Sequence, residues 1–295
     1  ELLEISGDIN EIPNNLFASN TTIKRLIIPQ SVKSFEQGSF NGCSSLNEIT
    51  IPSLISSIPE SMFKGCLSLD EIKLPSSVTS IGDFAFKDCK SLSRITIPSS
   101  VISFGKQIFD GVESLEILGG ISNLPNNFFE GYSSLTKIKI PTIKSIGDYT
   151  FNGCSSLKQI TIPSSVISIG NYAFNECSSL EQIKIPSVET IGIYAFNGCS
   201  SLKKIGIPSS VTTIENYAFK GCSSLEQIKI PNSVTSIGDF AFKGCSSFKQ
   251  IRIPSSVTSI GKGAFCECSS ISKINIPSFI TMINESLFDG CSSLN

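Results

Sequence analysis

The chain repeats one pattern of apolar and polar positions along its whole length. In residues 157–174 apolar side chains hold fixed slots and mainly polar residues separate them, in the order Leu157-x-x-Ile160-x-Ile162, Val166-x-x-Ile169 and Ala173-Phe174. The phenylalanines that close the units fall mostly 23 residues apart, at 17, 40, 63, 86, 109, 129, 151, 174, 196, 219, 242, 265 and 288. This regular period predicts a tandem array of stacked repeats.

Each unit predicts one short strand followed by a short return segment. The Leu-x-x-Ile-x-Ile stretch ends in alternating β-branched residues, and the proline after it, Pro163 in this unit, has no N–H to offer a sheet. A single unit cannot bury its apolar side chains alone, so equivalent strands are expected to pair in a parallel sheet at a spacing of about 4.8 Å. The return segment is too short for a long helix and suits a short strand or a single helical turn.

The slot after the second isoleucine is held mainly by two residue types with different backbone needs. It holds glycine at 82, 105, 147, 170, 192, 238 and 261 but proline at 13, 59 and 125. Proline fixes φ near −65°. If the backbone is alike in all repeats, glycine is there to allow close approach of a neighbouring turn rather than a left-handed conformation.

The combined spacing Leu-x-x-Ile-x-Ile and Val-x-x-Ile-Gly-x-x-Ala-Phe-x-x-Cys resembles the 23-residue leucine-rich repeat of the BspA-like (Treponema pallidum type) family. The resemblance covers essentially the whole chain. It implies a leucine-rich repeat solenoid, a curved right-handed superhelix of about 12–13 repeats, with a parallel sheet on the concave face and short strands and single helical turns on the return side. It also implies a surface-exposed or secreted protein of bacteria or parasitic protists that attaches to host matrix proteins or cells.

Residues 1–295 are expected to form a single solenoid, with two sub-arrays, 1–114 and 115–295, that arose by internal duplication. The units that close at Phe17 and Phe129 share a Pro-Asn-Asn sequence, and both lack the cysteine three residues later. This shared deviation favours duplication over independent drift. The short interval from Phe109 to Phe129, where Gly119 and Gly120 replace the usual Ile-Pro, predicts a local change of curvature.

Ten of the 11 cysteines occupy one slot, three residues after the phenylalanine, at 43, 66, 89, 154, 177, 199, 222, 245, 268 and 291. This array could be a disulfide framework, a metal ladder or a row of small buried hydrophobic side chains. Val112 stands in the same slot, which packing tolerates and a ladder of bonds does not, so packing is favoured. Cys266 falls in a slot that elsewhere carries Asn, Lys, Glu or Asp, and it is expected to be exposed.

The composition argues against an enzyme. The chain has no histidine, which removes histidine-based acid–base chemistry, catalytic dyads and histidine-ligated metal. No phosphate-binding glycine loop or separate carboxylate pair stands out from the repeat, and no cofactor is expected. A net charge of −2 is unlike that of a dedicated nucleic-acid binder, and no apolar run is long enough to span a membrane.

The polar positions of the predicted strand define a candidate binding surface. By alternation they point to one face, and together they carry 14 basic and 6 acidic residues, a net charge of +8 on a chain whose total is −2. This distribution favours an acidic partner. The alternative is that the charges only keep a long sheet soluble, since aromatic anchors are scarce there. The candidate binding residues are Lys137, Lys139, Lys158, Lys184, Lys203, Lys204, Lys229, Lys249, Arg252 and Lys273.

We therefore expect a non-enzymatic protein-binding repeat module. The resemblance implies cell-surface or extracellular adhesion to host or matrix proteins through the basic concave face. The alternative is a cytoplasmic scaffold or regulator that binds an acidic partner protein, which the thiol-rich core would suit. The expected partner is another protein, acidic or of the extracellular matrix, and neither nucleic acid nor a membrane span is expected. Because the sequence stops inside a unit at Asn295, self-association through an uncapped C-terminal end is also expected.

Overall fold

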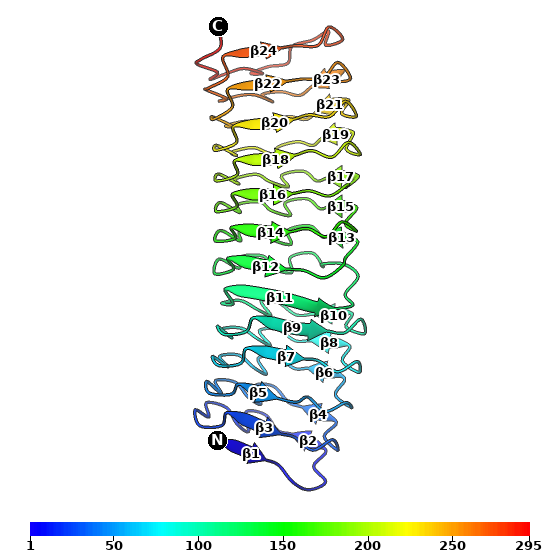
Figure 1. Cartoon of the computed structure of the whole chain (residues 1–295), viewed down its shortest axis with the longest axis vertical. Helices are drawn as coiled ribbons and strands as arrows, with labels where there is room; N and C mark the ends of the chain where they lie inside the picture. Colours follow the sequence, from blue (N-terminus) through cyan, green and yellow to red (C-terminus); the bar gives the residue numbers. More distant parts are fainter. The chain divides into compact units, whose positions relative to one another are not determined.

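The structure, a computed structural model, describes residues 1–295 and is built from short β-strands joined by turns. Two compact units are present: residues 1–122 with 134–141 form unit 1, and residues 123–133 with 142–295 form unit 2. In each unit, most turns of the chain place one strand on one side and a two-residue strand on the other (Figure 1). The predicted parallel β-solenoid is confirmed, but the return side contains no helix, so the predicted helical turns are not found.

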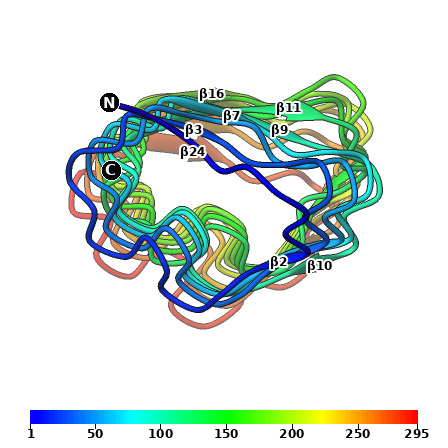
Figure 2. The ribbon, with the colours of Figure 1, turned by 90° about the horizontal axis from the view of Figure 1, so that it is seen from below.

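In unit 1 the first side of each turn pairs in parallel in the orders β1-β3-β5 and β7-β9-β11-β12, and the return side in the orders β2-β4 and β6-β8-β10. Seen from below, the first-side strands β3, β7 and β9 lie on one side and the return strands β2 and β10 on the other (Figure 2). The first-side strands are β1 (Leu2–Glu4), β3 (Arg25–Ile27), β5 (Glu48–Ile49), β7 (Glu71–Lys73), β9 (Arg94–Ile97), β11 (Ser114–Gly119) and β12 (Lys137–Lys139). The return strands are β2 (Glu11–Ile12), β4 (Ser34–Phe35), β6 (Ser57–Ile58), β8 (Ser80–Ile81) and β10 (Ser103–Phe104).

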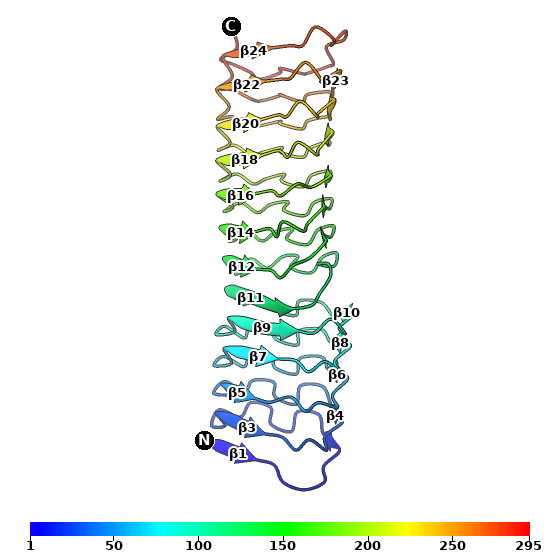
Figure 3. The same cartoon turned by 45° about the vertical axis from the view of Figure 1, so that its right-hand side comes forward.

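Unit 2 has the same plan, with first-side orders β14-β16-β18-β20 and β22-β24 and return orders β13-β15-β17 and β19-β21-β23 (Figure 3). The first-side strands are β14 (Gln159–Thr161), β16 (Gln182–Lys184), β18 (Lys204–Gly206), β20 (Gln227–Lys229), β22 (Gln250–Arg252) and β24 (Lys273–Asn275). The return strands are β13 (Ser145–Ile146), β15 (Ser168–Ile169), β17 (Thr190–Ile191), β19 (Thr213–Ile214), β21 (Ser236–Ile237) and β23 (Ser259–Ile260).

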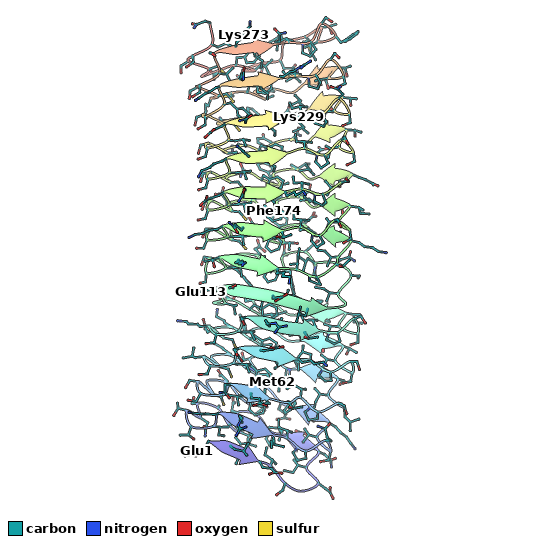
Figure 4. All side chains as sticks on the ribbon, in the orientation of Figure 1. Glu1, Met62, Glu113, Phe174, Lys229 and Lys273 are labelled. Carbon is teal, nitrogen blue, oxygen red and sulfur yellow. The ribbon has the colours of Figure 1, made fainter.

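The core of each unit is a set of ladders made by identical inward slots. Phe174, labelled in Figure 4, is fully buried, and its ring centroid lies 5.1 Å from that of Phe151 and 5.2 Å from that of Phe196. The rings are nearly parallel, with interplanar angles of 11° and 2°. Because each phenylalanine packs on the equivalent residue of the next turn, no turn can complete its core alone.

The cysteine slot is also part of the core. All 11 cysteines are free thiols, and Val112 is as buried as the cysteines it replaces. Each of the ten slot cysteines donates its thiol to the carbonyl oxygen of the phenylalanine in the preceding repeat, as in the 3.1 Å bond from Cys177 Sγ to Phe151 O. The sequence predicted that these cysteines are packed in the core. It did not predict the hydrogen bond, because the residue type in a repeated slot does not show which acceptor the thiol will meet.

The prediction for Cys266 was wrong, because its side chain is only 4% exposed. In the two neighbouring turns, the position equivalent to Cys266 is held by Lys243 and Asp289. The longer polar side chains that hold this slot elsewhere remain half-buried or exposed because they reach past their neighbours to solvent. A two-atom thiol side chain cannot reach that far and is covered.

The glycine slot behaves as the sequence predicts. At Gly192, φ is not left-handed, and a Cβ atom added there would lie 2.6 Å from the backbone nitrogen of Asn171 and the carbonyl carbon of Gly170. Ordinary van der Waals contact begins at 3.4 Å. Close approach of the preceding turn therefore accounts for glycine at this position.

Strand β11 departs from the predicted alignment. The repeat spacing Leu-x-x-Ile places Leu118, three residues after Leu115, in the slot of the central isoleucine. In the structure Ile117 is buried opposite Ile95 of β9 instead, while Leu118 is half-buried opposite Thr96. On its other edge β11 pairs with β12 two residues out of step, with Leu115 opposite Ile138. A two-residue slip preserves which side chains face inward, so the sheet accommodates the shortened repeat without exposing its core.

Candidate functional site: the basic face of unit 2

Each first-side strand of unit 2 exposes the two residues that flank its central isoleucine, and the residue directly before the strand, such as Lys158 before β14, is exposed as well. In β16, Gln182 and Lys184 are exposed and Ile183 is buried. The parallel register stacks equivalent positions in rows, so Thr161 lies opposite Lys184, and Gly206 lies opposite Lys229. We call this surface the unit-2 basic face; its exposed cations are Lys158, Lys184, Lys203, Lys204, Lys229, Lys249, Arg252 and Lys273 (Figure 4 labels Lys229 and Lys273).

The positive charge of this face is largely unneutralised by the protein itself. Only Lys203 forms an ion pair, with 3.7 Å between its Nζ and the carboxylate of Glu181. The other seven cations form no ion pair. Glu226 is the second acid of the face, so eight cations stand against two acids, a net charge of +6. Unpaired cations in one surface region create a potential that attracts anionic groups from solution.

The two remaining predicted residues, Lys137 and Lys139, lie on β12 and belong to unit 1. Both are exposed, but Lys139 is paired with Glu116, which also contacts Arg94. The hydrogen bond from Lys139 holds the pKa of the Glu116 carboxyl below its ordinary value, with further attraction from both cations. The ten predicted side chains therefore all reach solvent, but those of unit 1 lie in a more balanced charge environment.

A groove of about 650 Å³ runs across four strands of the unit-2 basic face. Its polar lining comes from β14, β16, β18 and β20, through Gln159, Thr161, Gln182, Lys184, Lys204, Gly206, Gln227 and Lys229. A second groove of about 460 Å³ on the same face includes Gln250, Arg252, Lys273 and Asn275. The surface offers ammonium groups together with amides that both donate and accept hydrogen bonds, a combination suited to binding rather than bond-breaking chemistry.

A second feature of unit 2, a partly exposed row of aromatic side chains, was missed by sequence reasoning. Tyr149, Tyr172, Tyr194, Tyr217 and Phe240 form a row in which adjacent ring centroids are 4.6, 4.6, 4.3 and 5.3 Å apart. All five have left-handed backbone conformations, with φ from 52° to 58°. Partial burial and the adjacent tyrosines raise the pKa of Tyr194. The signal was available, because these residues stand two places before the closing phenylalanine in successive repeats.

No group of three or more His, Cys, Asp or Glu side chains is placed to hold a metal ion. The structure contains no helix of the length and apolarity needed to cross a membrane. What its geometry provides is a repeated strand face with fixed rows of side chains.

A parallel solenoid of 23-residue turns with a phenylalanine ladder defines the class of leucine-rich repeat proteins. The chain matches the BspA type leucine rich repeat region in six copies, over residues 10–119, 122–225 and 168–295, and it belongs to this family. The family consists of repeat proteins and is not known for catalysis.

Solved structures with the same fold include a leucine-rich repeat protein from Bacteroides ovatus, which is 32% identical with a TM-score of 0.74. That match covers 99% of this chain and 85% of the other. A leucine-rich repeat protein from Eubacterium ventriosum is 24% identical with a TM-score of 0.52, over 96% and 86% of the two chains. The T. pallidum leucine-rich repeat protein is 26% identical with a TM-score of 0.42, over 68% and 77%. None of the curated proteins compared with the chain matches it.

Proposed function

We propose that this protein is a non-enzymatic binding module that holds an acidic partner protein against the unit-2 basic face. The observation that carries the proposal is the set of seven exposed cations on this face that have no ion-pair partner in the protein. A face that served only to stay soluble would be equally well served by balanced charge, as in unit 1, where Arg94 and Lys139 share Glu116.

We propose further that the protein acts at the cell surface or outside the cell, in adhesion to host or matrix proteins. Membership of the BspA-type family supports this location, because the resemblance in its repeats is to surface-exposed and secreted proteins. The scarcity of aromatic residues on the unit-2 basic face suits an attachment made of many weak charge contacts rather than a few hot spots.

The test is a solid-phase binding assay against immobilised matrix proteins, an acidic protein and an acidic polysaccharide. The variant carries Lys184, Lys204, Lys229, Lys249 and Arg252 changed to glutamate. A matched control carries glutamate at five lysines outside the face, Lys33, Lys64, Lys90, Lys106 and Lys144, none of which forms an ion pair. Both variants have the same net charge, so they differ only in where the charge is reversed.

The proposal predicts that the face variant loses binding, the control retains it, and the wild-type signal weakens as salt is raised. Equal loss in both variants would show that only net charge matters, and full binding by the face variant would place the site elsewhere. Location is tested separately by surface labelling of intact cells, with protection from an impermeant reagent counting against the surface role.

A further inference from the structure

One position breaks the row of side chains that follows the central isoleucines of the unit-2 basic face. The row runs Thr161 on β14, Lys184 on β16, Gly206 on β18 and Lys229 on β20. A Cβ atom added to Gly206 would meet nothing within 4 Å, and its φ is not left-handed. Neither close packing nor backbone conformation calls for glycine here. Because Gly206 has no side chain, it leaves a notch in the floor of the 650 Å³ groove.

Three unpaired cations surround this notch. Lys184 and Lys229 flank it along the row, and Lys204 lies two residues away on the same strand. All three are exposed and none forms an ion pair. Gln182 and Gln227, opposite Lys204 on the two neighbouring strands, place an amide on each side. A ligand in the notch would therefore meet two lysines along one row, and two amides with Lys204 between them along the adjacent row.

The spacing of the flanking lysines restricts the shape of the ligand. Neighbouring strands lie about 4.8 Å apart, so Lys184 and Lys229, two strands apart, are separated by roughly 9.6 Å at the backbone. A polyproline II segment rises about 3.1 Å per residue and returns to the same side every third residue, which gives about 9.3 Å between residues i and i+3. Two acidic side chains at i and i+3 of such a segment match the two lysines.

We propose that the notch at Gly206 is the docking site for an extended acidic peptide segment that crosses the strands. Its carboxylates at i and i+3 meet Lys184 and Lys229, and its backbone enters the space above Gly206. The amides of Gln182 and Gln227 can pair with peptide N–H and C=O groups, which a sulfated polysaccharide chain does not offer in the same way. The inference rests on the proposed function, and it specifies the ligand class and the part of the face that selects it.

The test uses fluorescence anisotropy with two labelled proline-rich peptides of identical composition, one with glutamates at i and i+3 and one at i and i+2. The Gly206→Thr variant fills the notch with the residue that β14 carries at this row, without changing charge. A Lys184→Gln/Lys229→Gln variant removes the flanking cations. A Lys106→Gln/Lys144→Gln variant removes two exposed, unpaired cations outside the unit-2 basic face as the matched control.

The expected result is that wild type prefers the i, i+3 peptide by about tenfold, a difference of roughly 1.4 kcal/mol. Gly206→Thr and the notch double variant should each abolish this preference, and the control variant should retain it. Equal binding of both peptides, or a Gly206→Thr variant that binds like wild type, overturns the notch. If a sulfated polysaccharide binds wild type and Gly206→Thr alike, the face is a general polyanion surface and the peptide site is wrong. The proposed function fails separately, if the face charge-reversal variant still binds its partner in the solid-phase assay.

Discussion

Replacing Gly192 with alanine tests whether the turns of the solenoid are held at a distance that only glycine permits. The added Cβ would lie 2.6 Å from two backbone atoms of the preceding turn and 2.7 Å from the carbonyl oxygen of Gly170. Reaching ordinary contact at 3.4 Å requires about 0.8 Å of backbone displacement. All three atoms belong to the backbone, so no flexible side chain can move aside.

The expected loss follows from two opposing terms. Overpacking of this kind costs about 1–3 kcal/mol, while replacing glycine restricts the unfolded chain and returns about 0.4–1 kcal/mol. The net destabilisation expected for Gly192→Ala is therefore about 1–2 kcal/mol. Gly206→Ala is the matched control, because its Cβ meets nothing within 4 Å and alanine suits a strand better than glycine. That variant should be stabilised by about 0.5–1 kcal/mol.

The chain has no tryptophan, so unfolding in urea is best followed by far-ultraviolet circular dichroism. Long repeat arrays can unfold in parts, and hydrogen exchange of the amides in β15 and β17 localises the effect to the altered turn. If Gly192→Ala is as stable as Gly206→Ala and exchange near β17 is unchanged, close approach is not the reason for glycine in this slot.

Phe196→Ala should destabilise unit 2 by about 3–5 kcal/mol, because it leaves a cavity in the row of stacked phenylalanine rings. Urea unfolding measures the loss of stability, and a loss below about 1 kcal/mol would contradict the role of the stacked rings. Burial raises the pKa of Cys89 and of Cys154 to about 12, from an ordinary value of 9.0. The raised folded-state pKa favours the neutral thiol, so this stabilisation is complete below about pH 9 and is lost between pH 9 and 12, as an alkaline unfolding series would show. A Cys154→Ala variant should lose less stability over that range. Lys139→Gln should raise the Glu116 pKa toward its ordinary value in an NMR titration, and an unchanged value would show that the pair is absent in solution.

The repeat made most of the fold predictable from sequence. Each slot is sampled a dozen times, so a position that accepts Gly and Pro, such as that of Gly192 and Pro59, reveals its backbone conformation without a structure. The failures fall where a slot is occupied unusually. Cys266 was misjudged because exposure depends on side-chain length as well as slot, and Leu118 because a shortened repeat can pair with its two neighbours in different registers.

The candidate site was only partly accessible to the same reasoning. The alternation of residues along the strand identified which lysines reach solvent. Whether a lysine forms an ion pair with a residue of the next turn depends on its rotamer and on that residue, so only the structure shows that Lys139 is paired and Lys184 is not. The row of four tyrosines and Phe240 was overlooked because its position in the repeat is variable. Other repeats carry Gly, Asn, Ser or Gln there, so the five successive aromatic residues do not stand out.

The ten cysteines that share one slot can be used to measure local opening of individual turns. Each of ten turns carries one cysteine in the same hydrogen-bonded slot, and nine of these side chains are buried. An alkylating reagent can reach such a thiol only when its own turn opens, so the rate at each cysteine measures the equilibrium for opening that turn when closing is fast. Mass spectrometry of peptides containing each cysteine would then give a profile of opening free energy along the chain without any introduced label. The shape of that profile would reveal whether the array melts from its ends, at the shortened repeat, or as cooperative blocks.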